Sequence, residues 1–382
     1  MSFRKRRTGL SIIVVALLVL VGGFAVIYSV IMAPLQAKKP PLSIVTPVAP
    51  AVATTTIAET SKVLADYVVE GDQLFSQGKL DEAIAAYNDA ITRDPKNARA
   101  YAHWGRILVV RNQASEGLAR VQKAIELDPS SGEYHSLLGL AYDWNNEFAK
   151  AVESCQKAVQ LAPTYAPAYG CLSEALADSG QLEKAVEAGK KAVQLDPKDA
   201  DIHRSYGYAL QSAGNFKAAE DEYRAAIDLA PKLSYLRLTL AALYRRVGRA
   251  DDAVIEFQKV IEAEPGNPQP YEGAGRVYYD LKRFDEAITF FKKATEVDPK
   301  RASAFSYVGW SFYLQEKYDL AVPFFQQALN LEPRRVEALG GMGWSQFMLA
   351  QYKESRETFS KALEIDPTND LAKRGLKSLE GR

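Results

Sequence analysis

The stretch YEGAGRVYYDLKRFDEAITFFKKATEVDP occupies residues 271–299 and ends in a proline that recurs along the chain at a fixed interval. The prolines of this set lie 34 residues apart, without insertion or deletion: Pro95, Pro129, Pro163, Pro197, Pro231, Pro265, Pro299, Pro333 and Pro367. A constant period of this length is typical of proteins built from stacked repeats, each of which packs against its neighbours. The proline spacing therefore predicts the fold of most of the chain.

Each unit is counted from the residue that lies 31 positions before its proline. The nine units then start at Leu64, Ala98, Gly132, Ala166, Ala200, Ser234, Pro268, Ala302 and Val336. The eighth position is small and the twentieth is mostly Ala, as at Gly275 and Ala287, which lets two helices approach closely. A ring such as Phe291 at the twenty-fourth position would fill the space between them. This pattern therefore predicts that each unit forms two antiparallel helices.

The turn between the two helices has its own signal at the fifteenth position. In the first six units this position is Gly or Asn, residues that tolerate the left-handed conformation in which many helices end. Three units depart from the pattern at the ring position, where they carry Val121, Cys155 and Gly189. We expect this segment to be looser, or to be filled by neighbouring side chains.

Together, the small eighth residue, the Ala, the ring and the terminal proline resemble the tetratricopeptide repeat over residues 64–369. The resemblance implies an all-α, right-handed superhelical solenoid of nine 34-residue helix-turn-helix repeats, which we place at residues 61–369. It also implies that the first helices line a concave groove that binds peptides or helices. Residues 370–382 would form the polar capping helix that an open solenoid end requires.

An uncharged and apolar segment near the start of the chain runs from Leu10 to Met32. As a helix its 23 residues would span about 34 Å, enough to cross the roughly 30 Å hydrocarbon core of a bilayer. We therefore expect a transmembrane helix over residues 10–33 that anchors the protein in the lipid bilayer. A cleaved signal peptide is the alternative, although its apolar region would be shorter.

The flanks of this segment differ in charge. Four basic residues precede it within residues 1–9, whereas two lysines follow it. The positive-inside tendency then keeps the N-terminus in the cytoplasm and places the bulk of the chain on the other side of the membrane. Residues 34–60 are rich in Pro, Ala and Thr and would form an extended linker. The sequence thus predicts a single-pass membrane protein whose repeats lie outside the cytoplasm.

Composition and spacing argue against several kinds of function. The chain has 47 basic and 47 acidic residues, with a slightly negative balance beyond the basic N-terminus, so we expect no nucleic-acid partner. His135 and His203 take the fourth position, which is Tyr in other units, and we interpret them as packing substitutes. His103 takes the sixth position, with no second ligand at metal spacing. We expect no catalytic, cofactor-binding or metal site, and hence no enzyme.

The only two cysteines, Cys155 and Cys171, lie in adjacent predicted helices of consecutive units. We interpret them as two small buried residues. A disulfide between them is the alternative, because the predicted compartment would be oxidising. Sequence spacing does not show whether their Cα atoms come within the ~7 Å that a bridge requires.

The C-terminal third carries aromatic residues at the positions that face the groove in this family. The predicted peptide-binding residues are Arg276, Tyr279, Trp310, Tyr313, Trp344 and Phe347. Rings on a concave face can anchor an extended peptide or an amphipathic helix. The alternative is that they pack between neighbouring first helices. The Lys and Asn pattern with which some members of the family hold a partner's C-terminal carboxylate is absent.

These observations favour a membrane-tethered scaffold that binds a protein or peptide in its groove and helps to recruit or assemble complexes outside the cytoplasm. A receptor on an organelle surface, with its repeats facing the cytosol as in mitochondrial import receptors, is the alternative. An enzyme is the third hypothesis, but no residues remain to form a catalytic domain. The oligomeric state is not predicted.

Overall fold

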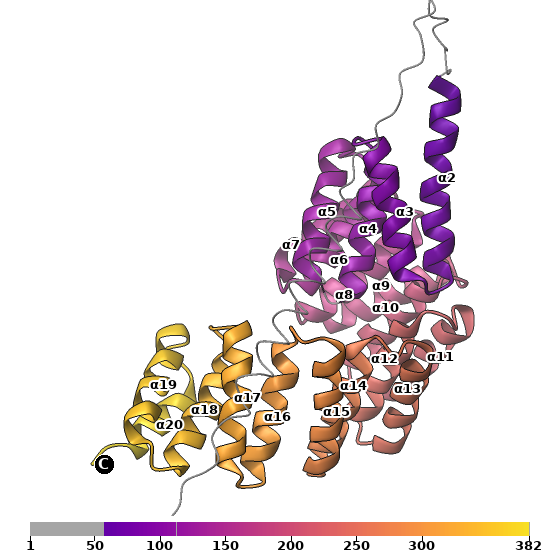
Figure 1. The fold of residues 1–382 in the computed structure, drawn as a ribbon. Coiled ribbons are helices and arrows are strands. Elements are labelled where there is room, and N and C mark those ends of the chain that lie inside the picture. The colour runs from indigo at the N-terminus through magenta and orange to yellow at the C-terminus, as the bar shows by residue number, and fades with distance from the viewer. Residues whose placement is uncertain (1–56, 112, 382) are drawn as a thin grey trace, which may run out of the picture. The chain divides into compact units, whose positions relative to one another are not determined.

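The computed structural model describes residues 57–111 and 113–381, all of which belong to one compact unit, residues 55–382. Within those ranges the chain forms 19 α-helices, α2 to α20, and no strand (Figure 1). The predicted all-α solenoid of two-helix repeats is therefore confirmed. Its right-handed sense stays a prediction.

First and second helices alternate along the chain. The first helices are α2 (Ile57–Ser76), α4 (Ala98–Val110), α6 (Gly132–Trp144), α8 (Ala166–Asp178), α10 (Ala200–Ser212), α12 (Ser234–Arg246), α14 (Pro268–Asp280), α16 (Ala302–Leu314) and α18 (Val336–Met348). The second helices are α3 (Leu80–Arg93), α5 (Ala114–Leu127), α7 (Phe148–Leu161), α9 (Leu182–Leu195), α11 (Phe216–Leu229), α13 (Ala250–Ala263), α15 (Phe284–Val297), α17 (Tyr318–Leu331) and α19 (Tyr352–Ile365). Helix α20 (Asp370–Ser378) follows the last unit.

The turn inside most units contains one residue with a left-handed backbone. In five units it is Gly or Asn: Gly78 (φ 76°), Asn146 (φ 62°), Gly180 (φ 79°), Gly214 (φ 82°) and Gly248 (φ 77°). The last three units place other residues there: Lys282 (φ 59°), Glu316 (φ 62°) and Ala350 (φ 58°). The last three units thus keep the left-handed turn although they lack the Gly or Asn that predicts it.

The repeated proline also fixes the start of the next first helix, because its carbonyl accepts a hydrogen bond from the fourth-position side chain. Four units make this contact: Tyr169 with Pro163 (3.1 Å), Tyr271 with Pro265 (3.2 Å), His135 Nε2 with Pro129 (3.0 Å) and His203 Nε2 with Pro197 (3.0 Å). The two histidines therefore replace tyrosine as hydrogen-bond donors, which supports their interpretation as structural residues.

Rings at the twenty-fourth position form the core between the helices of a unit. Tyr87, Tyr223, Phe291, Phe325 and Phe359 are at most 1% exposed. Each faces a small eighth-position residue; a Cβ added to Gly309, for example, would lie 2.8 Å from Phe325 Cε1. At Gly189, where the ring is missing, Tyr206 of the next unit takes the space, since an added Cβ would lie 2.6 Å from Tyr206 Cδ2.

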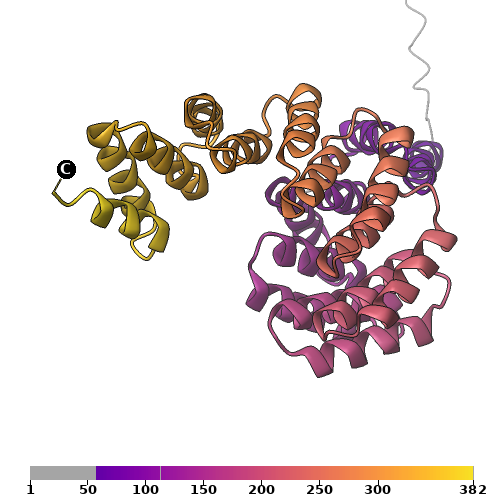
Figure 2. The ribbon, with the colours of Figure 1, turned by 90° about the horizontal axis from the view of Figure 1, so that it is seen from below.

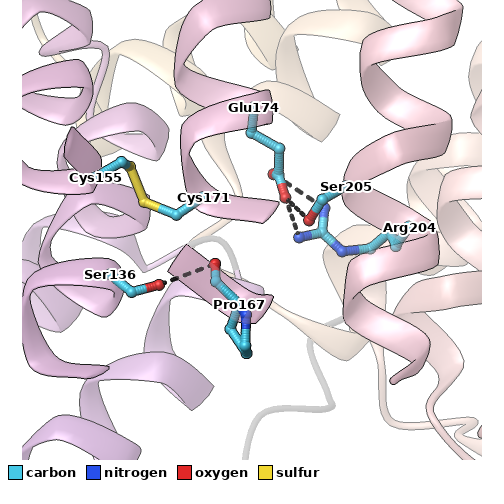
Figure 3. Close-up of a disulfide and its surroundings, with 7 residues drawn as sticks. All are labelled: Ser136, Cys155, Pro167, Cys171, Glu174, Arg204 and Ser205. Atoms are coloured by element: carbon cyan, nitrogen blue, oxygen red, sulfur yellow. Dashed lines mark hydrogen bonds and ion pairs between the residues drawn. A yellow bond between two sulfur atoms is a disulfide. The ribbon is translucent and has the colours of Figure 1, made fainter. Parts of the chain in front are cut away.

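The two cysteines form a disulfide between α7 and α8 (Figure 3). Their Cα atoms are 5.6 Å apart, within the range of ordinary bridges. The interpretation of Cys155 and Cys171 as unpaired buried residues is therefore wrong. The bridge fits because Gly139 on α6 has no side chain where both sulfur atoms lie.

Within the described part of the chain, the first two units contact later units that are distant in sequence. The turn at Gly78 touches the backbone carbonyl of Lys232 before α12, and Arg106 of α4 forms an ion pair with Asp201 of α10. Figure 2 shows this segment, from indigo to orange, curling back on itself while the last units continue outward. The N-terminal units therefore form a nearly closed turn.

No helix in residues 57–111 and 113–381 is long and apolar enough to cross a membrane. Even α2, which has 20 residues, carries Glu70 and Asp72 in its second half. The segment predicted as a transmembrane helix, residues 10–33, lies outside the described residues. The finding contradicts the predicted single-pass, extracytoplasmic localisation, which is wrong as stated, and a bilayer tether forms no part of the proposals below.

The predicted linker also ends earlier than expected. We placed its end at residue 60, whereas α2 begins at Ile57. The sequence after residue 56 contains no further proline before Pro95, and residues such as Ala and Glu favour a helix. The other first helices, from α4 to α18, begin at the starting residues of the proline-based units.

Candidate protein-binding groove

Three consecutive first helices of the N-terminal half are joined by one histidine. His103 on α4 places Nδ1 2.5 Å from Asp72 Oδ1 on α2 and Nε2 2.9 Å from Glu133 Oε1 on α6. Carboxylate oxygens only accept hydrogen bonds, so this geometry favours a doubly protonated ring. Burial lowers the pKa of His103, but the hydrogen bonds and charges of Asp72 and Glu133 raise it above its ordinary value overall.

A second polar cluster joins units that lie far apart in sequence. Arg106 of α4 forms an ion pair with Asp201 of α10, whose Oδ1 also accepts a 2.6 Å hydrogen bond from Tyr235 of α12. Burial raises the pKa of Asp201, but the guanidinium groups of Arg106 and Arg204 hold it below its usual value. The carboxylate therefore stays charged and connects three first helices.

The third cluster lies beside the disulfide (Figure 3). Arg204 donates to both oxygens of Glu174, at 2.7 and 3.2 Å, and Ser205 donates to the same carboxylate. Nearby, Asp143 is only 5% exposed. Burial, together with the charges of Asp178 and Glu174, raises the pKa of Asp143 to about 9. This carboxyl group therefore keeps its proton at neutral pH.

The space directly beside the first and third clusters is small. The cavity lined by residues of α4, α6, α8 and α10 has a volume of about 120 Å³. A water molecule takes about 30 Å³ of liquid volume, so this space fits a few waters or one side chain but not a peptide backbone. This part of the groove is thus occupied by the protein's own side chains, whereas a larger space of about 600 Å³ lies where Leu80 of the first unit faces Tyr235 of the sixth.

The six predicted peptide-binding residues, Arg276 and five rings, lie on α14, α16 and α18, and we call them the ladder. Trp310 packs edge-on against Tyr313 and Phe325, with centroid distances of 5.4 and 5.5 Å. One unit later, Trp344 repeats the arrangement with Phe347 at 5.5 Å and Phe359 at 5.6 Å. The structure therefore presents the same ring pair in two successive units.

Arg276 and Tyr279 begin the ladder on α14. The Arg276 guanidinium lies 4.8 Å from the ring centroid of Tyr307 and pairs with Glu272 at 2.5 Å. Tyr279 contacts Tyr307 and Phe284 edge-on. Burial, with the charges of Tyr307 and Asp280, raises the pKa of Tyr279 to about 12. Tyr279 is therefore a neutral hydroxyl donor at physiological pH.

All six ladder residues are half-buried, so each ring packs against its own unit and keeps part of its surface in solvent. Beside them Leu314 and Met348, at the thirteenth position of their units, are 45% and 48% exposed. Trp344 donates its indole N–H to the carbonyl of Leu371 at 3.3 Å, whereas the contacts found for Trp310 are with rings. The peptide-binding role of the ladder stays a prediction.

Sequence reasoning missed the polar clusters of the N-terminal half. His103 takes the sixth position of its unit, and its two carboxylate partners lie 31 and 30 residues away in sequence. The ion pair of Arg106 with Asp201 spans 95 residues. A 34-residue period predicts contacts between adjacent units. It therefore explains the two contacts of His103 but not the ion pair of Arg106 with Asp201. Among the described residues, no group of His, Cys, Asp or Glu could hold a metal ion.

Models of one family match most of the repeat region. Those described as "TPR repeat" or "Tetratricopeptide repeat" match residues 71–109, 132–165, 174–214, 201–233, 269–334 and 312–379. No curated protein matches the chain.

Two solved structures illustrate the likeness of fold. A chain of the crystal structure of the APC/C hetero-tetramer Cut9–Hcn1 superposes with a TM-score of 0.56 at 18% identity, over 78% of this chain and 59% of that one. Yeast Tom70 superposes with a TM-score of 0.54 at 14% identity, over 84% of this chain and 96% of that one. The present chain thus spans about three fifths of the first structure's chain. At these identities the likeness shows the fold alone.

Proposed function

Because this chain contains tetratricopeptide repeats between residues 71 and 379, we propose that it is a protein-interaction scaffold. The ladder on α14, α16 and α18 would hold a peptide or an amphipathic helix of a partner protein. By holding that partner the scaffold would help to recruit or assemble a protein complex. A solenoid of this kind is suited to protein–protein interaction.

The observation that carries the proposal is the repetition of the half-buried ring pair in two successive units. Trp310 with Tyr313 and Trp344 with Phe347 are held edge-on by their own units. Rings that are already fixed lose little conformational freedom when a partner binds, so more of the contact energy appears as affinity. Trp, Tyr and Arg are also the residues that dominate binding energy at protein interfaces.

The apolar surroundings of the ladder support the same assignment. The exposed Leu314 and Met348 extend it toward the turn of each unit. No charged residue stands at the ninth, twelfth or thirteenth position of the last two units. The surface therefore favours a partner segment with apolar side chains at regular spacing, as an amphipathic helix provides.

The import-receptor alternative gains no specific support. The likeness to Tom70 is a likeness of fold at 14% identity. The same fold is shared with the Cut9–Hcn1 chain at 18% identity. Fold alone does not distinguish one binding role from another.

The ladder can be tested by comparing partner capture by variants of the full chain. Bound proteins from the native source would be quantified by mass spectrometry for the wild type, for Trp310→Ala with Trp344→Ala, and for Trp144→Ala. Trp144 is a matched control, since it lies on the first helix α6 and is 38% exposed. A specific partner should lose at least tenfold in recovery with the ladder variant, because truncating a central Trp commonly removes about 2 kcal/mol or more.

A second variant adds positive charge beside the ladder and leaves the packed rings in place. Leu314→Lys with Met348→Lys should also release the partner, while circular dichroism and thermal unfolding stay unchanged. The proposal would be abandoned if every reproducible partner bound all three variants as well as it bound the wild type.

A further inference from the structure

A groove on the outer face of the fourth unit is distinct from the ladder. It lies over α8 and between the second helices α7 and α9, and its volume is about 580 Å³. Its floor is formed by Leu172, Leu176 and Ala188, and its sides carry lysine side chains. Comparison with other units shows why the space is open.

In later units two rings fill the corresponding position. The eleventh residue of the first helix and the twenty-third residue of the unit stack there: Phe312 on Phe324 at 5.6 Å and Tyr278 on Phe290 at 5.3 Å. Lys292 of the preceding second helix covers the first pair, with Nζ 5.7 and 5.5 Å from the two centroids. The outer groove of the eighth unit is thus filled by a ring pair and covered by a cation.

In the fourth unit the two ring positions are Leu176 and Ala188. The covering position on the preceding second helix is Gln156, which is exposed at the edge of the groove. Leu and Ala here occupy much less volume than the ring pairs that fill this position in the seventh and eighth units. The groove therefore has the shape of a site from which aromatic side chains are missing.

The charges around the groove are mainly positive. Its lining includes Lys184, Lys190 and Lys191 but only one carboxylate, Glu187. Lys184 donates to Gln181 at 2.9 Å. Lys190 and Lys191 are exposed, and neither makes an ion pair with any carboxylate in the described part of the chain. Two lysine ammonium groups are thus free to meet an acidic partner.

We propose that this outer groove binds a segment of a partner protein that carries an aromatic side chain flanked by Asp or Glu. The aromatic side chain would enter the space above Leu176 and Ala188, as Phe324 does within its own unit. The flanking carboxylates would pair with Lys190 and Lys191. Exposed charge pairs of this kind contribute mainly to specificity and association rate, while the buried ring supplies the affinity.

The test uses the full chain and a fluorescent nonapeptide with one central Phe and Asp or Glu on both sides. Binding should be saturable by fluorescence anisotropy and should weaken at least tenfold in Ala188→Phe, which fills the groove from within. Phe occupies the same position in two later units, at Phe290 and Phe324, so the variant should fold. Ala188→Ser is the matched control, because Ser154 holds this position in the preceding unit, and it should bind like the wild type.

Three further measurements test the roles of the lysines and of the Phe and distinguish this site from the ladder. Lys190→Glu with Lys191→Glu should also weaken binding at least tenfold, and a peptide with Ala in place of Phe should not bind. Leu314→Lys on the ladder should leave the affinity unchanged, which keeps this site separate from the proposed function. Equal binding by Ala188→Phe and the wild type, or binding to phosphatidylserine vesicles that Ala188→Phe does not reduce, would overturn the proposal.

Discussion

At the scale of single residues, the left-handed turn position divides the solenoid into two parts. Gly248 adopts φ 77° without strain, and no atom lies within 4 Å of an added Cβ. Ala350 adopts φ 58° at the same position of the last unit, where its methyl group makes the conformation unfavourable. A residue other than Gly in this conformation costs about 1–2 kcal/mol. The C-terminal units therefore fold despite a local penalty that earlier units avoid.

Replacing Ala350 by Gly should stabilise the last unit. The gain in the folded state is offset in part by the greater freedom of Gly in the unfolded chain, so we expect about 0.5–1 kcal/mol. Because repeat proteins can unfold unit by unit, the effect is best measured locally. Amide hydrogen exchange in α18 and α19 should slow by about two- to fivefold in Ala350→Gly.

The converse change at Gly248 is the control. Gly248→Ala should speed exchange in α12 and α13 by a similar factor, since open space around the residue leaves backbone conformation as the main difference. Unchanged exchange in α18 and α19 for Ala350→Gly, with the expected effect for Gly248→Ala, would show that the last turn is not strained.

These residues also show how far local sequence can be interpreted. Gly and Asn at the fifteenth position predict a left-handed turn because the backbone requirement acts on that residue itself. Ala350 carries no such signal, and its conformation follows from the period and from packing of the unit. Likewise, Gly189 could be identified as a missing ring, but its replacement by Tyr206 depends on packing between two units.

At the scale of helices, the disulfide is the one covalent cross-link between side chains of different units in the described part of the chain. Cys155 on α7 and Cys171 on α8 are fully buried, and the bridge spans 16 residues. Closing a loop of this length is worth about 3 kcal/mol in the chain-entropy account. Reduction in denaturant, followed by refolding under reducing conditions, should therefore lower the stability of the third and fourth units by that order.

Urea unfolding followed by hydrogen exchange in α7 and α8 would measure this loss. The variant Cys155→Ala with Cys171→Ala provides the control, because its stability should not respond to reductant. Two free thiols in the native protein under oxidising conditions, or equal stability with and without reductant, would contradict the pairing. Sequence spacing could not settle the pairing, since it depends on the close approach that Gly139 permits.

At the scale of the whole repeat domain, the ion pair of Arg106 with Asp201 connects the second and fifth units. Its neighbours are Arg204 and Tyr235, so the half-buried carboxylate lies within a polar cluster. The pair connects α4 to α10 across the N-terminal turn. The period of 34 residues predicted contacts between adjacent units, but the curvature that unites units three apart accumulates from small rotations at every interface.

Removing one partner should open this turn. Asp201→Asn leaves the half-buried Arg106 guanidinium without its carboxylate, and losing one partner of such a hydrogen bond costs about 1–3 kcal/mol. We expect the N-terminal units to separate from α10 and α12. Small-angle scattering should then show a larger radius of gyration, and hydrogen exchange should rise in α4 and α10 together.

Replacing both partners by apolar residues tests whether their charges or their packed volume keep the N-terminal turn closed. Arg106→Met with Asp201→Leu removes the charges while keeping most of the volume, and such replacements of buried pairs are often neutral or stabilising. This double variant should keep the compact scattering profile if packing between α4 and α10 sets the curvature. An open profile in the double variant would mean that the ion pair itself closes the turn, whereas a compact profile for Asp201→Asn would show that the carboxylate charge is not needed.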